Sequence, residues 1–310
     1  MSNATAAEPV SERARSLLRG AYDMHVHISP DVVPRRVDDL TLARRFAELG
    51  LAGFQLKSHY TSTAERASVV RAVVPDVHVM GAIALNRAVG GMNAVAVEIA
   101  AREGARTVWF PTVDSVNESG EETRIPPGAA VPVWMELQRE LRDEGVAIEP
   151  VPVVDADGVV LPETRVVLAA IARHRLVLAT GHLSRDEIFA VVDAAREEGV
   201  GEIVITHPDF PSQDLSIDDQ ASLAARGALL ERCFTTPHTR KMTWERLFEA
   251  IRATGPEHSV LSTDLGQKAN PDVEDGLGLM ADRLLDAGFD EEAVHTMAVV
   301  NTRRLAGADA

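Results

Sequence analysis

The chain has 310 residues, 45% of them hydrophobic, and a formal net charge of −16. This charge argues against nucleic acid or an anionic membrane as a bulk partner, although it does not exclude an anionic small molecule beside a metal ion. The single cysteine, Cys233, rules out an intramolecular disulfide, and we interpret it as a small buried hydrophobic residue. Residues 1–10 do not resemble a signal peptide, and no apolar run reaches the roughly 18 residues of a membrane span, so the expected location is the cytoplasm.

Strand and helix patterns alternate along the chain. Short apolar runs between turn residues predict eight strands, at 22–28, 53–59, 77–84, 106–112, 176–181, 202–206, 228–234 and 259–263. Apolar stripes with caps and stop signals predict helices at 11–19, 40–49, 62–74, 93–102, 131–144, 184–198, 216–226, 243–253, 277–287 and 291–305. The stretches 62–65 and 184–187 are typical capping boxes that open two of these helices.

The alternation is interrupted after the fourth strand. Residues 115–128 are polar and rich in Glu, Gly and Pro, which indicates a long loop, and residues 155–158 are typical of a hairpin turn. We interpret 113–175 as an insertion within a single domain that spans residues 1–310. The eight strand–helix units predict a (β/α)8 barrel of the TIM type with this insertion between strands four and five. An open, doubly wound sheet with fewer strands is the alternative.

A histidine pair lies on the first predicted strand. His25 and His27 are two residues apart, so their side chains point to the same face of the strand. Two neutral imidazoles on one face can bind a divalent cation. The alternative is a pair of buried core histidines, which is costly unless both are hydrogen-bonded.

Further metal-ligand residues follow later strands. His182, His207 and Asp264 come at the carboxyl ends of strands five, six and eight. Each alone has a simpler interpretation, as a helix-entry, turn or loop-bracing residue. In a closed barrel, however, these strand ends meet at the rim where active sites are built.

This combination resembles the amidohydrolase superfamily of metal-dependent hydrolases. The resemblance is carried by His25 and His27 on strand one, His182 on strand five, His207 on strand six and Asp264 on strand eight. The tail 301–307 is similar to the Asn-Pro-Ala-x-x-Leu-Gly ending common in that superfamily, with a threonine in place of the proline.

The resemblance implies a TIM barrel and a role for each ligand. His25 and His27 would bind one divalent metal together with Asp264, which would also act as general base. His182 and His207 would bind a second metal, or position substrate and water in a one-metal member. Zinc is the first expectation for the metal, and Mn, Fe or Co suit the same ligands. Such a cation lowers the pKa of a bound water and polarises a carbonyl or phosphoryl oxygen.

The fourth strand departs from the superfamily pattern. Two-metal members commonly carry a bridging carboxylated lysine or a glutamate there, and residues 106–112 contain neither. Lys57, at the end of the second strand, is the nearest substitute and is included in the predicted metal site. It could be a carbamate that bridges two metals, an ammonium that binds a substrate carboxylate, or a lysine that extends to the rim without a special role.

Several polar residues at strand ends or in the loops after them are candidates for substrate binding. They are His59, Tyr60, Asn86, His238 and Arg240. His59 shares a face with Lys57 and is alternatively a further metal ligand. For each of the loop residues alone, ordinary solvated polarity is the simpler interpretation. Glu231 falls on strand seven, and the pattern gives it no role.

The leading functional hypothesis is a metal-dependent hydrolase that cleaves a C–N or C–O bond, in an amide, cyclic amide, lactone or ester, with Asp264 as general base. A metal-dependent decarboxylase or other lyase is the alternative favoured by the missing ligand on strand four. A phosphoesterase of the polymerase-and-histidinol-phosphatase type also opens with His-x-His, but its usual Asp-x-His ending is Asp-Leu-Gly here, at 264–266. A barrel that keeps a metal for stability, or a binding protein, is the non-catalytic reading. The expected partner is a small-molecule substrate, and a homodimer is the commonest assembly on general grounds.

Overall fold

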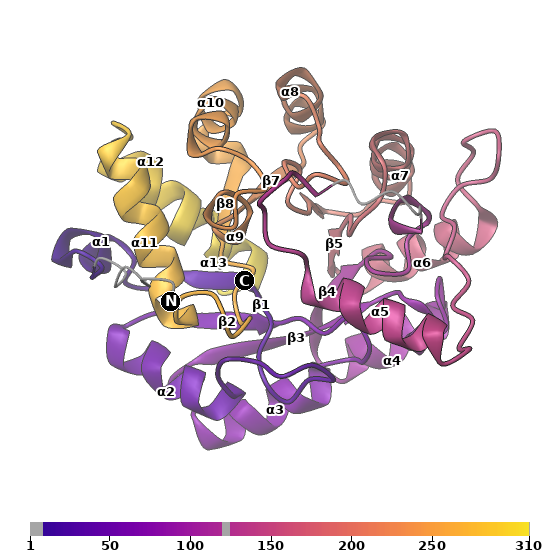
Figure 1. Cartoon of the computed structure of the whole chain (residues 1–310), viewed down its shortest axis with the longest axis horizontal. Helices are drawn as coiled ribbons and strands as arrows, with labels where there is room; N and C mark the ends of the chain where they lie inside the picture. The colour runs from indigo at the N-terminus through magenta and orange to yellow at the C-terminus, as the bar shows by residue number, and fades with distance from the viewer. Residues whose placement is uncertain (1–8, 120–124, 310) are drawn as a thin grey trace.

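The computed structural model describes residues 9–119 and 125–309 and shows a barrel of parallel strands surrounded by helices (Figure 1). The sheet has eight strands in the order β1 to β8, and every neighbouring pair is parallel. The strands are β1 Tyr22–Val26, β2 Gly53–Leu56, β3 His78–Ala84, β4 Ala105–Trp109, β5 Val177–Ala179, β6 Glu202–Ile205, β7 Leu229–Cys233 and β8 Ser259–Ser262. The predicted (β/α)8 barrel is therefore confirmed.

The barrel closes between the first strand and the segment that follows the last one. Asp264 N donates to His25 O at 2.9 Å, and His27 N donates to Leu265 O at 2.8 Å. Gly266 permits this approach, because a Cβ there would lie 1.5 Å from the carbonyl oxygen of His27 and its φ is +133°. Closure therefore places Asp264 directly beside the histidine pair of β1.

The helices cover the outside of the barrel, and sequential helices lie side by side around it (Figure 1). They are α1 Glu12–Leu17, α2 Asp39–Leu49, α3 Ala64–Val73, α4 Ala94–Arg102, α5 Val133–Asp143, α6 Pro162–Arg173, α7 Arg185–Glu197, α8 Ile217–Ala225, α9 Thr235–His238, α10 Trp244–Thr254, α11 Val273–Asp286, α12 Glu291–His295 and α13 Asn301–Ala306. Short turns of other helix types lie at η1 Arg87–Val89, η2 Val116–Glu118, η3 Pro256–His258 and η4 Thr296–Val300. In the described part of the chain, no helix is long and apolar enough to cross a membrane.

Two helices differ from the sequence prediction. Helix α6 was not predicted, because its apolar residues form an almost continuous run without a clear helical period. It packs between α4 and α7 as a barrel helix, so the additional segment lies between β4 and α6, inside the predicted range 113–175. The short helix α9, directly after β7, was also not predicted.

The capping box predicted at 62–65 is wrong. Thr63 is the N-cap residue of α3, but its side chain makes no capping hydrogen bond. Its hydroxyl instead donates to Leu56 O and accepts from Ala82 N, each at 2.8 Å, and so ties β2 to β3. The box at 184–187 is confirmed, with Ser184 and Glu187 in their expected roles.

The roof segment, residues 110–119 and 125–161 between β4 and α6, lies at the mouth of the barrel. It contains η2 and α5, and Ala130 N donates to Thr239 O at 3.3 Å, just beyond α9. The expected hairpin at 155–158 is a turn with one isolated antiparallel bridge, between Val154 and Val160. This segment therefore forms a roof over the carboxyl ends of the strands.

Candidate metal centre and active-site pocket

His25 and His27 converge as their spacing predicts. His25 lies near the end of β1 and His27 directly after it, while Val26 between them points into the apolar layer under the helices. The two Nε2 atoms are 3.2 Å apart, and both side chains are buried. Burial lowers the pKa of His27 well below its ordinary value, against the opposing effect of Asp264, so its imidazole is neutral and available as a ligand.

Asp264 completes a group of three ligand atoms. Its Oδ1 lies 3.3 Å from the Nε2 of His25 and 3.3 Å from that of His27. The residue has a φ of +53°, an uncommon backbone conformation for a residue other than glycine. Thr235, at the start of α9, donates its hydroxyl to Oδ2 at 3.0 Å. Although burial acts to raise it, the pKa of Asp264 is held well below its ordinary value by His25, His27 and Lys57.

The dimensions of this group fit a small divalent cation. The three ligand–ligand separations are 3.2, 3.3 and 3.3 Å. A tetrahedral site with metal–ligand bonds of about 2.0–2.1 Å has edges of about 3.4 Å, so the three atoms match one face of such a site. Two imidazoles and a carboxylate are also ligands that Zn²⁺, Mn²⁺, Fe²⁺ and Co²⁺ accept.

Glu231 supports this group from β7. Its Oε1 lies 3.1 Å from His25 Nδ1, and its Oε2 accepts a hydrogen bond from His207 N at 3.2 Å. Burial acts to raise the pKa of Glu231, but His25, His207 and Lys57 lower it to about 2. The sequence analysis assigns no role to Glu231. An acidic residue on a buried strand is nevertheless a signal, because a buried carboxylate needs partners.

Lys57 points into the same group. Its Nζ lies 2.9 Å from His25 Nε2 and 5.1 Å from the ring centre of Trp109, and the residue is 3% exposed. Burial lowers the pKa of Lys57, with Asp264 and Glu231 opposing this effect. The side chain is thus directed at the histidines rather than at the solvent. Trp109 lies at the end of β4, the strand on which neither bridging ligand of the superfamily pattern occurs.

His182 and His207 form the neighbouring wall. Their ring centres are 4.9 Å apart, and the ring of His207 lies 6.1 Å from that of His25. Nδ1 of His207 is 3.1 Å from Gln213 Oε1, and Nδ1 of His182 is 3.0 Å from Glu118 Oε1. Burial lowers the pKa of both histidines, so both are neutral.

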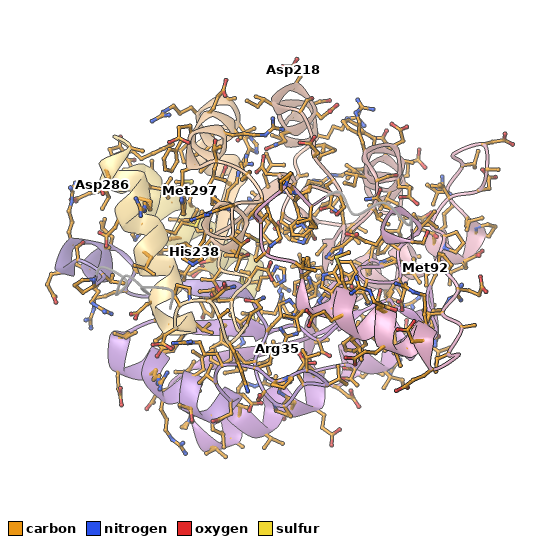
Figure 2. All side chains as sticks on the ribbon, viewed as in Figure 1. Arg35, Met92, Asp218, His238, Asp286 and Met297 are labelled. Carbon is orange, nitrogen blue, oxygen red and sulfur yellow. The ribbon has the colours of Figure 1, made fainter. Side chains whose placement is uncertain are left out.

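The predicted substrate-binding residues divide into two groups. His59 lines the pocket, with its ring stacked 4.8 Å from that of His27. Asn86 lies behind it and donates to His59 O at 2.8 Å, and Tyr60 contacts His59 edge-on with ring centres 6.0 Å apart. His238 and Arg240 are exposed, and the structure places neither of them in the pocket wall. Figure 2 shows His238 and Arg35 at separate places around the barrel.

These side chains open into a cavity of about 130 Å³ under the roof segment. Besides the residues discussed above, the wall contains several that the sequence analysis did not single out. They are Arg35, Ala130, Val131, Pro132, Val133, Trp134, Phe210, Thr235, Thr239, Lys241, Gln267, Ala269 and Asn270. They come from loops whose spatial proximity is set by barrel closure and by the roof, so no local sequence signal identifies them.

Three comparisons place the chain among known proteins. The model of a family of unknown function, DUF6282, matches residues 20–231. No curated protein matches the sequence.

Solved structures share the fold over nearly the whole chain. An amidohydrolase from Pseudomonas aeruginosa aligns with a TM-score of 0.61 at 10% identity, covering 94% of this chain and 98% of that one. The probable dipeptidase PvdM from the same organism gives 0.62 at 12% identity, with 96% and 97% covered. A putative 2-pyrone-4,6-dicarboxylic acid hydrolase from Pseudomonas putida gives 0.57 at 16% identity, with 94% and 99% covered. These likenesses confirm the TIM-barrel fold that the resemblance to the amidohydrolase superfamily implied.

Proposed function

Since the chain belongs to the family of unknown function DUF6282, its activity must follow from its own site, and we propose that it is a metal-dependent hydrolase. The bond cleaved is a C–N or C–O bond of a small molecule, in an amide, cyclic amide, lactone or ester. The observation that carries this proposal is the triangle of His25 Nε2, His27 Nε2 and Asp264 Oδ1, whose sides of 3.2–3.3 Å suit a single divalent cation.

A cation held by these three residues would supply a Lewis acid and a water of lowered pKa. Asp264 is the general base in this proposal. It accepts a proton from the attacking water and returns it to the leaving nitrogen or oxygen. Thr235 holds Oδ2 of this carboxylate at 3.0 Å, which fixes the direction in which it can exchange the proton.

The remaining residues orient the reactants. Glu231 accepts from His25 Nδ1, which keeps the opposite nitrogen, Nε2, free to act as ligand. His182 and His207 present neutral imidazoles on the adjacent wall, where they can bind a polar oxygen of the substrate or a second cation. The roof segment limits the access of bulk water to the site.

A lyase reaction, such as decarboxylation, is a second candidate on the same scaffold. The observation that favours it is Trp109, an apolar side chain at the end of β4, 5.5 Å from His25 in ring-centre distance. A site without a bridging ligand at this place suits one cation rather than two. The two reactions are separated by their products, because only decarboxylation releases carbon dioxide.

The test is to purify the protein, measure bound metal by elemental analysis, and assay a panel of amides, cyclic amides, lactones and esters. Phosphomonoesters and unsaturated carboxylic acids belong in the same panel. Asp264→Asn should remove hydrolysis, whereas Asp286→Asn, at the exposed end of α11 (Figure 2), should keep it. Full turnover by metal-free protein or by Asp264→Asn contradicts the proposal, and release of carbon dioxide or phosphate would replace it with one of the alternatives.

A further inference from the structure

The wall of the active-site cavity carries a charge opposite to that of the whole chain. The chain has a net charge of −16, yet the cavity wall contains Arg35, Lys57 and Lys241 against a single carboxylate, Asp264. Lys57 is directed at His25 and Arg35 is paired with Asp31, so Lys241 is the one cation of the wall without a charged partner among the described residues. Partly buried cations are costly unless an anion accompanies them. The excess positive charge therefore points to an anionic ligand.

Arg35 is held in place by its Nε, while its two terminal nitrogens remain available for a ligand. Its Nε donates to Asp31 Oδ2 at 2.7 Å, and both side chains are almost fully buried. Within residues 9–119 and 125–309, the two terminal nitrogens of Arg35 make no hydrogen bond. The backbone of Arg35 forms an antiparallel bridge with Gln267, three residues after Asp264, so its position relative to the carboxylate is set by the backbone. A guanidinium held in this way presents paired N–H groups that match a carboxylate.

Lys241 faces the cavity from another loop, between α9 and α10. Its Nζ donates to Thr239 Oγ1 at 2.8 Å and lies 5.5 Å from the ring centre of Phe210. None of the described carboxylates forms an ion pair with it. A half-buried ammonium whose partners are a hydroxyl and an aromatic ring has capacity for an anion. Trp134 and Phe210 supply flat apolar surface in the same cavity.

We propose that Arg35 and Lys241 bind a carboxylate group of the substrate while its scissile bond lies at the His25–His27–Asp264 group. The inference deepens the proposed function and rests on it: the substrate is a small amide, lactone or ester that also carries a carboxylate, with a planar or apolar body between Trp134 and Phe210. A carboxylate is preferred to a phosphate because the sequence contains no Gly-Lys-Ser/Thr phosphate-binding loop.

The first experiment measures binding without turnover. Isophthalate, benzoate and benzamide form an aromatic series of dianion, monoanion and neutral molecule, and their affinities for the purified metal-loaded protein can be measured by calorimetry. The carboxylates should bind and benzamide should not. Lys241→Met should weaken carboxylate binding about 10- to 100-fold, the usual cost of one hydrogen bond to a charged group. Lys268 is an exposed lysine outside the cavity wall, so Lys268→Met should leave the carboxylate affinity unchanged. Lys241→Arg should keep part of the affinity that Lys241→Met loses.

The second experiment measures the turnover of pairs of esters or amides. The two members of a pair are identical except that one carries a free carboxylate and the other carries the methyl amide of that carboxylate. Lys241→Met and Arg35→Lys should lower kcat/KM for the anionic member, mainly through KM, by a much larger factor than for the neutral member. Asp264-dependent hydrolysis of both members, with no effect of Lys241→Met on the anionic one, overturns the inference but keeps the proposed function. Carboxylate binding that depends on Lys241 in a protein without hydrolytic activity supports the inference and overturns the hydrolase. Preference for phenyl phosphate over benzoate overturns the assignment to a carboxylate.

Discussion

Glu231 Oε1 and His25 Nδ1 lie 3.1 Å apart at the centre of the barrel, between β7 and β1. The contact determines which nitrogen of His25 faces the cavity, because an Nδ1–H that donates to Glu231 leaves the lone pair on Nε2. The same carboxylate accepts from His207 N, so one side chain orients residues of two strands.

Removing this carboxylate should weaken the metal centre without unfolding the barrel. Glu231→Gln keeps the size of the side chain but replaces an anionic acceptor, and metal affinity should fall about 10- to 100-fold, as is usual for partners of histidine ligands. Competition titration with a chromogenic chelator measures this change. Equal affinity in Glu231→Gln and the unmodified protein would show that the contact does not orient His25.

Metal removal should lower the stability of the protein. If the folded chain alone binds the cation, a free concentration one hundred times Kd adds about 2.7 kcal/mol to the free energy of unfolding. Thermal unfolding of chelator-treated protein should therefore occur at lower temperature, and added Zn²⁺, Mn²⁺, Fe²⁺ or Co²⁺ should reverse the shift to different extents. Asp264→Asn should reduce the response, and a variant that responds in full would argue that the cation binds elsewhere.

Gly266 should tolerate no side chain. A Cβ there would lie 1.5 Å from His27 O, and relief of this clash has to separate β1 from the segment after β8. Gly266→Ala should therefore cost at least about 4 kcal/mol or prevent folding, because the clash involves backbone on both sides. Gly288→Ala is the matched control, since its φ is also positive, +86°, and its Cβ would have no neighbour within 4 Å. Urea unfolding of both variants compares the two costs, and equal costs would mean that only the backbone conformation matters.

The buried ion pair behind the site should matter more for stability than those on the surface. Arg232 is fully buried, and its Nη1 lies 3.0 Å from Asp209 Oδ2 and donates to Gln220 Oε1 at 2.5 Å. Asp209→Asn leaves this guanidinium without its counter-charge and should cost about 3–5 kcal/mol in the free energy of unfolding. Asp193→Asn breaks the exposed pair with Arg226 and should cost less than about 1 kcal/mol. Chemical denaturation measures the loss in the free energy of unfolding for each variant. Similar losses in the two variants would refute this ranking.

Carboxylate binding should depend on pH through Lys241. Burial lowers the pKa of this ammonium from its ordinary value of 10.5, with Asp264 opposing the change. The cation is present below the lowered pKa, so benzoate affinity should be constant near neutral pH and fall as the pH rises through that pKa. Lys241→Arg should keep its affinity to higher pH, because a guanidinium stays charged. A decline at the same pH in both proteins would assign the titration to another group.

The barrel and the histidine pair could be predicted because their signals are local. The alternation of side chains along β1 fixes the common direction of His25 and His27, and a repeated strand–helix order implies the barrel on whose rim His182, His207 and Asp264 meet. Helix α6 was missed because an apolar run hides its period.

The rest of the site depends on relationships that one sequence does not display. Arg35 and Lys241 are ordinary loop cations in the sequence, and only closure of the barrel and the path of the roof bring them to one cavity. Glu231 can be recognised in the sequence as an acidic residue on a buried strand, but its partners, His25 and His207, cannot. His238 and Arg240 come after the correct strand, yet α9 directs them outward.

The hydrogen bond from Ala130 N to Thr239 O joins two separate segments of the cavity wall at the mouth of the barrel. A polypeptide or polysaccharide lying across the barrel end would have to break this bond, whereas a detached molecule, or the terminal unit of a chain, would not. In the proposed hydrolase, this stretch of backbone would therefore favour small molecules and chain ends as substrates, although it takes no part in the chemistry.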